Sequence, residues 1–329
     1  MSNKAIFGSM VGVLVVILVI FTFTNGPGDQ SEASNEPLRI TINSWIGWAP
    51  LYLAKEKNLN DGVAVDIIRV EDTGTRKATM ISGEVDGYAS SVDNFALDAS
   101  LGVPGKIVLC FDESFGGDGI VARKSIGTLN DLIGKKIGYQ KGLPSHFLLL
   151  AALKNAGLSG DDVVHVDMDA DKAGAAFVAG HLDAAVTWEP WISKAADMAD
   201  GKILLTTRDF PGLIVDALVF REDVIKNRKD DIGKLVYGWF SALDYWNNHK
   251  EEADQIMAEA YGLDPADFRD MCAGVRFYDL ARNRSYMGAG PDSEIYGVFR
   301  MAGDLWISAG VTTQTAEPES RIDPSFVGN

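Results

Sequence analysis

Residues 81–93 (ISGEVDGYASSVD) and residues 178–190 (VAGHLDAAVTWEP) read almost alike, although about a hundred residues separate them. In both segments an aspartate (Asp86 and Asp183) stands three residues after a glycine, and a short apolar run and a polar loop follow it. The sequence therefore predicts one α/β unit that occurs twice. A loop at the carboxyl end of a strand in each unit predicts a ligand site in a cleft between two lobes.

The alternation of strands and helices continues along the chain. Short apolar runs, such as residues 38–43 and 136–139, alternate with stretches of helical length as far as residue 220. This order is typical of mainly parallel sheets. From residue 223 onward the apolar residues recur at helical spacing. The predicted fold class is therefore α/β, with a C-terminal set of helices on the first lobe.

The chain is predicted to pass between the lobes twice, near residues 119–123 and 209–216. Two crossings make a hinge between the lobes. The predicted domains are a discontinuous lobe 1, residues 38–121 and 213–329, and an inserted lobe 2, residues 122–212.

The composition indicates a folded protein of two domains, since 329 residues exceed one ordinary core. Hydrophobic residues make up 47% of the chain and charged residues 23%, values typical of globular proteins. The formal net charge is −16, which argues against nucleic acid and anionic membrane surfaces as partners.

The N-terminus carries a membrane signal. Residues 5–24 contain no charge and follow Lys4, and about twenty apolar residues can span a bilayer. A suitable cleavage site is missing after this run, which favours an uncleaved anchor over residues 1–24. A cleavable signal peptide is the alternative. Residues 25–37 are rich in Gly, Pro and Ser and predict a flexible tether.

The sequence offers no catalytic or metal-binding set. It lacks the GxSxG, HExxH and P-loop motifs and has no CxxC pair or His/Cys cluster. We therefore expect no cofactor and no catalytic residue. Its two cysteines, Cys110 and Cys272, are interpreted as buried thiols, although spacing leaves a disulfide open.

Two loops that follow predicted strands carry aromatic and polar residues. Trp45 and Trp48 follow the first strand and precede a helix, where their rings can pack on a small ligand. Ser145 and His146 open a helix in the second lobe, where a hydroxyl, an imidazole and free N–H groups can bind an acid group. The alternatives are core packing for the tryptophans and N-capping for Ser145.

Acidic residues gather at the ends of the repeats and at the crossings. The first repeat ends in Ser90 and Asp93, and the second in Trp188 and Glu189. The predicted ligand site is completed by residues beside the two crossings, which are Asp112, Ser114, Asp118 and Asp216. Burial of unpaired carboxylates is unfavourable, so a ligand that meets several of them should carry an amine. Solvation or helix capping is the alternative for any single acid.

Four segments resemble the nitrate/taurine/sulfonate (NitT/TauT-type) family of ABC-transporter solute-binding proteins over about residues 38–310. They are residues 44–59 (SWIGWAPLYLAKEKNL), 83–94 (GEVDGYASSVDN), 128–158 (TLNDLIGKKIGYQKGLPSHFLLLAALKNAGL) and 177–191 (FVAGHLDAAVTWEPW). The resemblance implies a type II periplasmic binding protein fold, with two α/β lobes joined by a two-strand hinge. It also implies ligand capture by lobe closure, without catalysis, and delivery to a permease with a cytoplasmic ATPase.

By motif position the resemblance extends the family's ligand contacts to seven residues, Trp45, Trp48, Ser90, Ser145, His146, Trp188 and Glu189. The acidic loop 112–118 departs from what nitrate or a plain sulfonate would require. We therefore predict a zwitterion such as taurine, or another amine-bearing metabolite. The predicted location is the periplasm, with the protein tethered to the inner membrane or released there after cleavage.

Two other functions fit the same resemblance. A membrane-tethered ligand sensor would need the same lobes and the same site. Thiamine-pyrimidine synthesis enzymes share the fold, but their cysteine-rich metal-binding segment is absent from this sequence.

Overall fold

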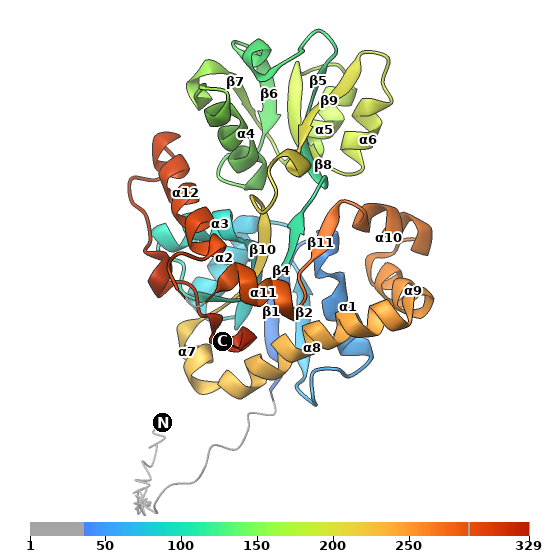
Figure 1. Ribbon diagram of the computed structural model, residues 1–329, viewed down its shortest axis with the longest axis vertical. Helices are drawn as coiled ribbons and strands as arrows, with labels where there is room; N and C mark the ends of the chain where they lie inside the picture. Colours follow the sequence, from blue (N-terminus) through green and yellow to red (C-terminus); the bar gives the residue numbers. More distant parts are fainter. Residues whose placement is uncertain (1–35, 289, 329) are drawn as a thin grey trace, which may run out of the picture. The chain divides into compact units, whose positions relative to one another are not determined.

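The computed structural model describes residues 36–288 and 290–328 (Figure 1). The predicted anchor at residues 1–24 and nearly all of the predicted tether lie outside these described residues. Within them, no helix is both long enough and apolar enough to cross a membrane.

The first sheet has six strands in the order β11-β4-β10-β3-β1-β2. Strand β1 pairs in parallel with β2 and β3, whereas β10 runs antiparallel to β3 and β4. The strands are β1 (Leu38–Ile42), β2 (Val65–Arg69), β3 (Gly87–Ser91), β4 (Lys106–Ser114), β10 (Val215–Phe220) and β11 (Val275–Phe277). Strands β3 and β10 are buried along their whole length, which explains why they lack a polar face.

The second sheet has five strands in the order β7-β6-β8-β5-β9. They are β5 (Asp118–Arg123), β6 (Lys136–Tyr139), β7 (Val164–Asp167), β8 (Ala184–Trp188) and β9 (Gly201–Thr206). Strand β8 pairs in parallel with β6 and antiparallel with β5, as β3 does with β1 and β10 in the first sheet.

Helices cover both sheets, and α12 packs against α3 and α4. Helix α3 follows the first repeat, whereas α4 follows β6 of the second sheet (Figure 1). The helices are α1 (Ala49–Glu56), α2 (Thr73–Ser82), α3 (Val92–Ser100), α4 (Pro144–Asn155), α5 (Ala170–Val178), α6 (Trp191–Ala196), α7 (Glu222–Asn227), α8 (Lys229–Asn248), α9 (Lys250–Tyr261), α10 (Pro265–Cys272), α11 (Leu280–Met287) and α12 (Glu294–Ser308).

The predicted repeat is confirmed by its hydrogen bonds. The Asp86 carboxylate accepts a bond from the backbone N–H of Arg39 at 2.8 Å, and the Asp183 carboxylate accepts one from Lys136 at 2.8 Å. In each sheet the aspartate thus holds the start of the parallel neighbour strand. The two repeats end in β3 and β8, the corresponding strands of the two sheets.

The chain leaves the first sheet earlier than the sequence suggests. Strand β5 pairs over its length with β8 and β9, so the crossings lie at residues 115–117 and 207–214. The Ser114 and Thr207 hydroxyls join the two crossings at 3.0 Å, and Gly116 N–H donates to the Thr207 hydroxyl at 2.7 Å. The division into lobe 1 (residues 38–121 and 213–329) and lobe 2 (residues 122–212) stays a prediction. The pairing of β5 with the second sheet places residues 118–121 with lobe 2 rather than lobe 1.

The C-terminal helices differ in detail from the sequence prediction. The three-residue strand β11 and the polar helix α11 were not predicted, because neither shows a clear apolar period. Helix α12 begins at Glu294 after Ser293. Both cysteines of the chain are described by the structure, and both are free thiols.

Asn283 completes the hydrogen bonding of β4 where no strand continues the sheet. Strand β11 pairs only with the 112–114 end of β4. Beyond that end, the wholly buried Asn283 side chain accepts from Cys110 N and donates to Cys110 O, both at 2.9 Å. A single amide from α11 therefore replaces a neighbouring strand.

We expect Asn283→Ala to lower the free energy of unfolding by about 2–4 kcal/mol, because the peptide N–H and C=O of Cys110 lose their partner in the core. Urea unfolding of the full chain measures this loss. The control Asn248→Ala removes an exposed amide and should change stability by less than about 0.5 kcal/mol. Equal stabilities of the two variants would contradict the bridging role of Asn283.

Candidate functional site

Two aspartates face each other across the centre of the first sheet. Asp216 of β10 lies directly opposite Asp112 of β4, and opposite Ser91 of β3 on its other side. Opposed residues of antiparallel strands direct their side chains to the same face. The two carboxylates and the Ser91 hydroxyl therefore form one row beside the crossings.

Asp93 and Asp118 complete a group of four acids, here called the aspartate cluster. Asp93 lies in the first turn of α3, and Asp118 opens β5 directly after the first crossing. Asp93 and Asp112 are 0% exposed, Asp118 is 5% exposed and Asp216 is 7% exposed. Four carboxylates from two sheets are thus held out of water in electrostatic contact with one another.

Burial and mutual repulsion disfavour the charged forms of these acids. Burial, and to a lesser extent the charge of Asp118, raise the pKa of Asp93 and of Asp112 to about 7. Burial raises the pKa of Asp118 to about 6. The pKa of Asp216 is raised well above its ordinary value by burial and by the charges of Asp112, Asp118 and Asp93.

The cluster has unsatisfied hydrogen-bonding capacity. Within the described part of the chain, both carboxylate oxygens of Asp93 and Oδ2 of Asp112 lack a hydrogen bond of good geometry. The Ser91 hydroxyl and the first N–H groups of α3 still act on Asp93, and Asp216 acts on Asp112, and these contacts partly offset the rise in pKa. The other Asp112 oxygen accepts a bond from Trp45 Nε1 at 3.3 Å. Buried carboxylates without a cationic partner are rare in proteins and indicate a missing donor or cation.

Other buried acids of this protein have cations, which sets the cluster apart. Glu113 pairs with Arg276 at 3.2 Å, and Asp254 pairs with Arg269 at 3.3 Å. Among the described residues, no lysine or arginine forms an ion pair with the cluster. The buried Arg76 acts on Asp216 only through its charge, because its guanidinium donates to Ala89 O.

The backbone of Gly47 and the ring of Trp45 lie close to Asp112 of the aspartate cluster. A Cβ atom on Gly47 would lie 2.2 Å from Asp112 Oδ2 and 2.4 Å from Trp45 Nε1, so no larger residue fits there. The Trp45 ring also lies against Gly117 of the first crossing. On the other side, the half-buried Trp188 is the residue opposite Asp118. These two tryptophans, unlike Trp48, lie beside the carboxylates.

Three of the predicted site residues have structural contacts instead. Trp48 is buried, donates to Asn43 Oδ1 at 2.6 Å and packs edge-to-face on Phe111, as a core residue does. Ser90 points to the opposite face from Ser91 and donates to Asn94. The Glu189 carboxylate accepts from the N–H and hydroxyl of Ser193, which matches the capping alternative.

The second-sheet loop does not touch the cluster. The Ser145 hydroxyl accepts from Gln140 N–H at 3.3 Å. His146 Nδ1 accepts from Gly142 N–H at 3.2 Å, and its ring stacks on Tyr139. Ser114 holds the backbone of Asp118 in place, because its hydroxyl accepts a hydrogen bond from Asp118 N–H at 3.1 Å.

Sequence reasoning missed Gly47, Ser91 and Thr207. Ser91 has a buried hydroxyl that lies beside Asp216 and acts on the Asp93 carboxylate. The strand period of two distinguishes it from Ser90, but only the pairing with β10 shows which of the two faces the aspartates. Thr207 begins a short 3-10 helix (Thr207–Asp209), and no sequence pattern indicates that it joins the crossings.

The chain belongs to the NMT1-like family, whose sequence pattern matches residues 31–262. A proposed binding protein of Brucella abortus is 27% identical over 242 residues, which cover 71% of this chain and 75% of that protein. The taurine-binding periplasmic protein of Escherichia coli is 28% identical over 178 residues, 53% of this chain and 54% of that protein. The predicted resemblance to taurine- and sulfonate-binding proteins is thereby confirmed.

Solved structures confirm the predicted fold. The periplasmic aliphatic sulphonate binding protein SsuA of Escherichia coli superposes with a TM-score of 0.72 at 20% identity, covering 88% of this chain and 92% of that one. The desulfurization enzyme DSZB also shares the fold, with a TM-score of 0.63 at 14% identity, covering 89% of this chain and 98% of that one. Both binding proteins and an enzyme therefore have this fold. The fold alone does not decide between the two functions, and the residues of the site have to be considered.

The raised pKa values make the stability of the ligand-free protein depend on pH. The folded state holds protons that the unfolded chain releases, so the free energy of unfolding falls as pH rises from about 4 to about 7. Asp93→Asn removes one buried charge. We expect it to raise the free energy of unfolding by about 1–2 kcal/mol near pH 8 and to give no gain near pH 4.

Urea unfolding of wild type and variant at both pH values measures this difference. Asp244→Asn, at an exposed position on α8, is the matched control and should show no pH-dependent gain. If Asp93→Asn and wild type differed equally at both pH values, Asp93 would not be a repelled, buried charge.

Proposed function

We propose that this protein is an extracytoplasmic solute-binding protein of an ABC importer that captures a small amine-bearing organic solute at the aspartate cluster. The observation that carries the proposal is a set of four buried carboxylates without a cationic partner among the described residues. The names of the relatives support a binding role, and one of them is a taurine-binding periplasmic protein.

A ligand ammonium would supply the charge that the cluster lacks. Burial of unpaired carboxylates is unfavourable by several kcal/mol, and a hydrogen-bonded cation offsets that cost. An ammonium has three N–H donors, which the buried carboxylates of Asp93 and Asp112 can accept. The rings of Trp45 and Trp188 beside the carboxylates offer π faces or apolar walls.

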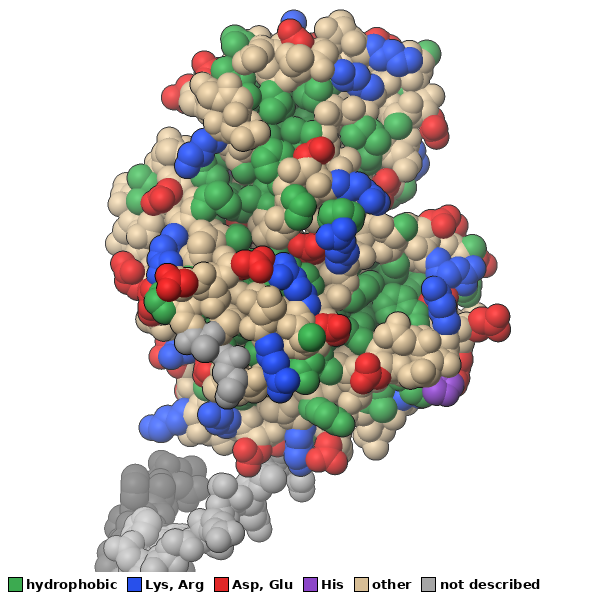
Figure 2. Space-filling view, in the orientation of Figure 1, with side chains coloured by type: hydrophobic (Ala, Val, Ile, Leu, Met, Phe, Trp, Pro, Cys, Tyr) green, Lys and Arg blue, Asp and Glu red, His purple; other side chains and the backbone are tan. Residues whose placement is uncertain are grey.

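A plain anion is less well supported. The residues expected to hold an acid group, Ser145 and His146, make local hydrogen bonds. Burial lowers the pKa of His146 to about 4, so its imidazole is neutral at physiological pH. The face drawn in Figure 2 has acidic and basic side chains interspersed, with no broad basic patch. A cation, or a zwitterion bound through its amine, fits these features better than nitrate or a simple sulfonate.

The remaining steps follow from the class of protein. The crossings at residues 115–117 and 207–214 are the hinge about which the two sheets would close on the ligand. The closed, loaded protein would deliver the solute to a permease with a cytoplasmic ATPase. Its place would be the periplasm, tethered to the inner membrane by residues 1–24 or released there after cleavage.

Native mass spectrometry of the protein purified from its host should identify a co-purified small molecule with a basic nitrogen. Calorimetry with that molecule should give a Kd roughly 30-fold or more higher for Asp118→Asn, because loss of one partner of a buried charge pair costs about 2–5 kcal/mol. The affinity of the wild type should also fall as pH drops below about 7, where protons compete for Asp93 and Asp112.

Asp244→Asn, on the exposed surface of α8, should bind the molecule as wild type does. A co-purified ligand without any cationic group would overturn the proposal. So would undiminished affinity of Asp118→Asn for an amine-bearing one.

A further inference from the structure

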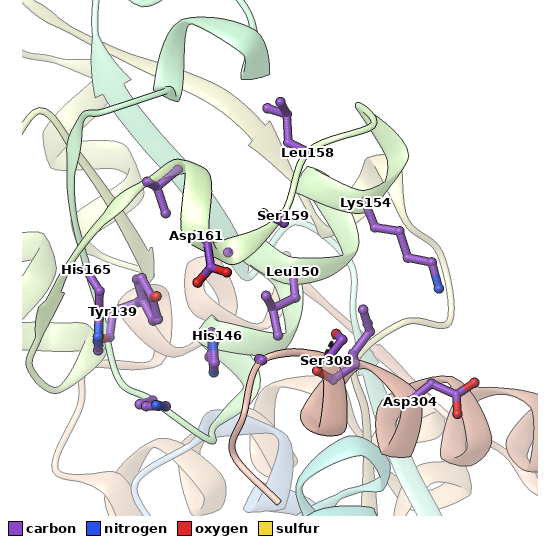
Figure 3. A pocket seen from close by; sticks show the side chains of 15 residues that line it. Tyr139, His146, Leu150, Lys154, Leu158, Ser159, Asp161, His165, Asp304 and Ser308 are labelled. Atoms are coloured by element: carbon purple, nitrogen blue, oxygen red, sulfur yellow. Dashed lines mark hydrogen bonds between the residues drawn. The ribbon is translucent and has the colours of Figure 1, made fainter. Parts of the chain in front are cut away.

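A groove of about 640 Å³ lies between α4 and the C-terminal half of α12 (Figure 3). Its floor consists of side chains that are almost fully buried, which are Tyr139, His146, Leu150, Val163 and Leu305. None of the residues described as lining it belongs to the aspartate cluster. The groove is therefore a separate concavity, formed by the second sheet's helix on one side and by a helix packed on the first sheet on the other.

His146 presents a hydrogen-bond donor in this groove. Its Nδ1 accepts from Gly142 N–H at 3.2 Å, so the neutral ring carries its proton on Nε2. The residue is 3% exposed, and it lines the groove. A neutral imidazole with its proton on Nε2 can therefore donate a hydrogen bond to a molecule in the groove.

Tyr139 adds a second donor next to the first. Its ring stacks on His146 with centroids 4.8 Å apart, and it is 4% exposed. Burial and the nearby charge of Asp167 raise the pKa of Tyr139 to about 12, which keeps the hydroxyl protonated. Tyr139 also lines the groove. Tyr139 and His146 thus lie side by side in the groove (Figure 3), and Lys141 also lines it.

The rest of the floor is apolar. Leu150 of α4, Val163 before β7 and Leu305 of α12 line it, and Leu158 lies above them. The acids Asp161 and Asp304 stand on the exposed rim, where water and salt screen their charge. Asp167, whose charge acts on Tyr139, already accepts a bond from Lys141 N–H at 3.2 Å. The buried surface therefore combines hydrogen-bond donors with hydrocarbon.

We propose that this groove is a second ligand site, which binds a small organic acid with an apolar body. The carboxylate accepts from His146 Nε2–H and the Tyr139 hydroxyl, near the Lys141 ammonium. The alkyl chain lies along Leu150 and Leu305. An occupant of this kind contacts α4 and α12 at once, and so bridges elements that belong to different sheets.

Calorimetric titration of hexanoate into the full chain near neutral pH tests the proposal. We expect one saturable site, and at least tenfold weaker binding of hexanamide, which has the same chain but no charge. Tyr139→Phe should weaken hexanoate binding about tenfold by loss of one hydrogen bond to a charged group. Tyr237→Phe, the same change at a tyrosine that is 66% exposed, should leave binding unchanged.

The substitution Ser308→Trp tests whether hexanoate binds in this groove, and it leaves the buried residues of the floor unchanged. Ser308 is exposed on the rim of the groove, so the indole can fill the groove while the fold is kept, and hexanoate binding should be lost. Absence of a saturable hexanoate signal would overturn the proposal. Equal binding of hexanamide, or wild-type binding by both Tyr139→Phe and Ser308→Trp, would overturn it as well. These results are independent of the aspartate cluster, because an anion is repelled from it.

Discussion

The burial of four neighbouring carboxylates is the constraint on which the rest of this site depends. Asp112 and Asp216 are fixed opposite each other by the pairing of β4 and β10, so neither can move away without loss of sheet hydrogen bonds. Gly47 lies against the Asp112 carboxylate, so that any side chain at this position would collide with it. A strain of this kind persists only where the surrounding fold maintains it, and it is typical of functional sites.

The duplicated unit explains how one chain positions groups from two sheets. Asp86 and Asp183 make the same bond in the two sheets, and each repeat ends beside a crossing. At the start of α3, Trp306 Nε1 donates to Asp93 O at 2.9 Å, and its ring packs on His146. One side chain of α12 thus connects the aspartate cluster to the groove beside α4. The two proposed sites are separate in their chemistry but joined through Trp306.

The sequence predicted the α/β repeats, most strands and the four aspartates, because apolar periodicity and acidic loops are local features. Directions of side chains depend on long-range pairing, which a sequence alone does not give. Ser90 was chosen over Ser91 since only the register with β10 separates them. Glu189 caps α6 through a contact four residues away, and His146 faces α12 rather than the aspartates. Strand β11 is too short to leave a pattern, and Asn283 acts through a partner 173 residues distant.

The central claim is that a ligand cation replaces protons in the aspartate cluster. Calorimetry of the co-purified ligand near pH 6.5, in two buffers of different ionisation enthalpy, counts the protons exchanged on binding. Since the pKa values of Asp93 and Asp112 are about 7 and that of Asp216 is higher, the account predicts release of about one proton or more per ligand bound. Binding without proton exchange, or with proton uptake, would contradict it.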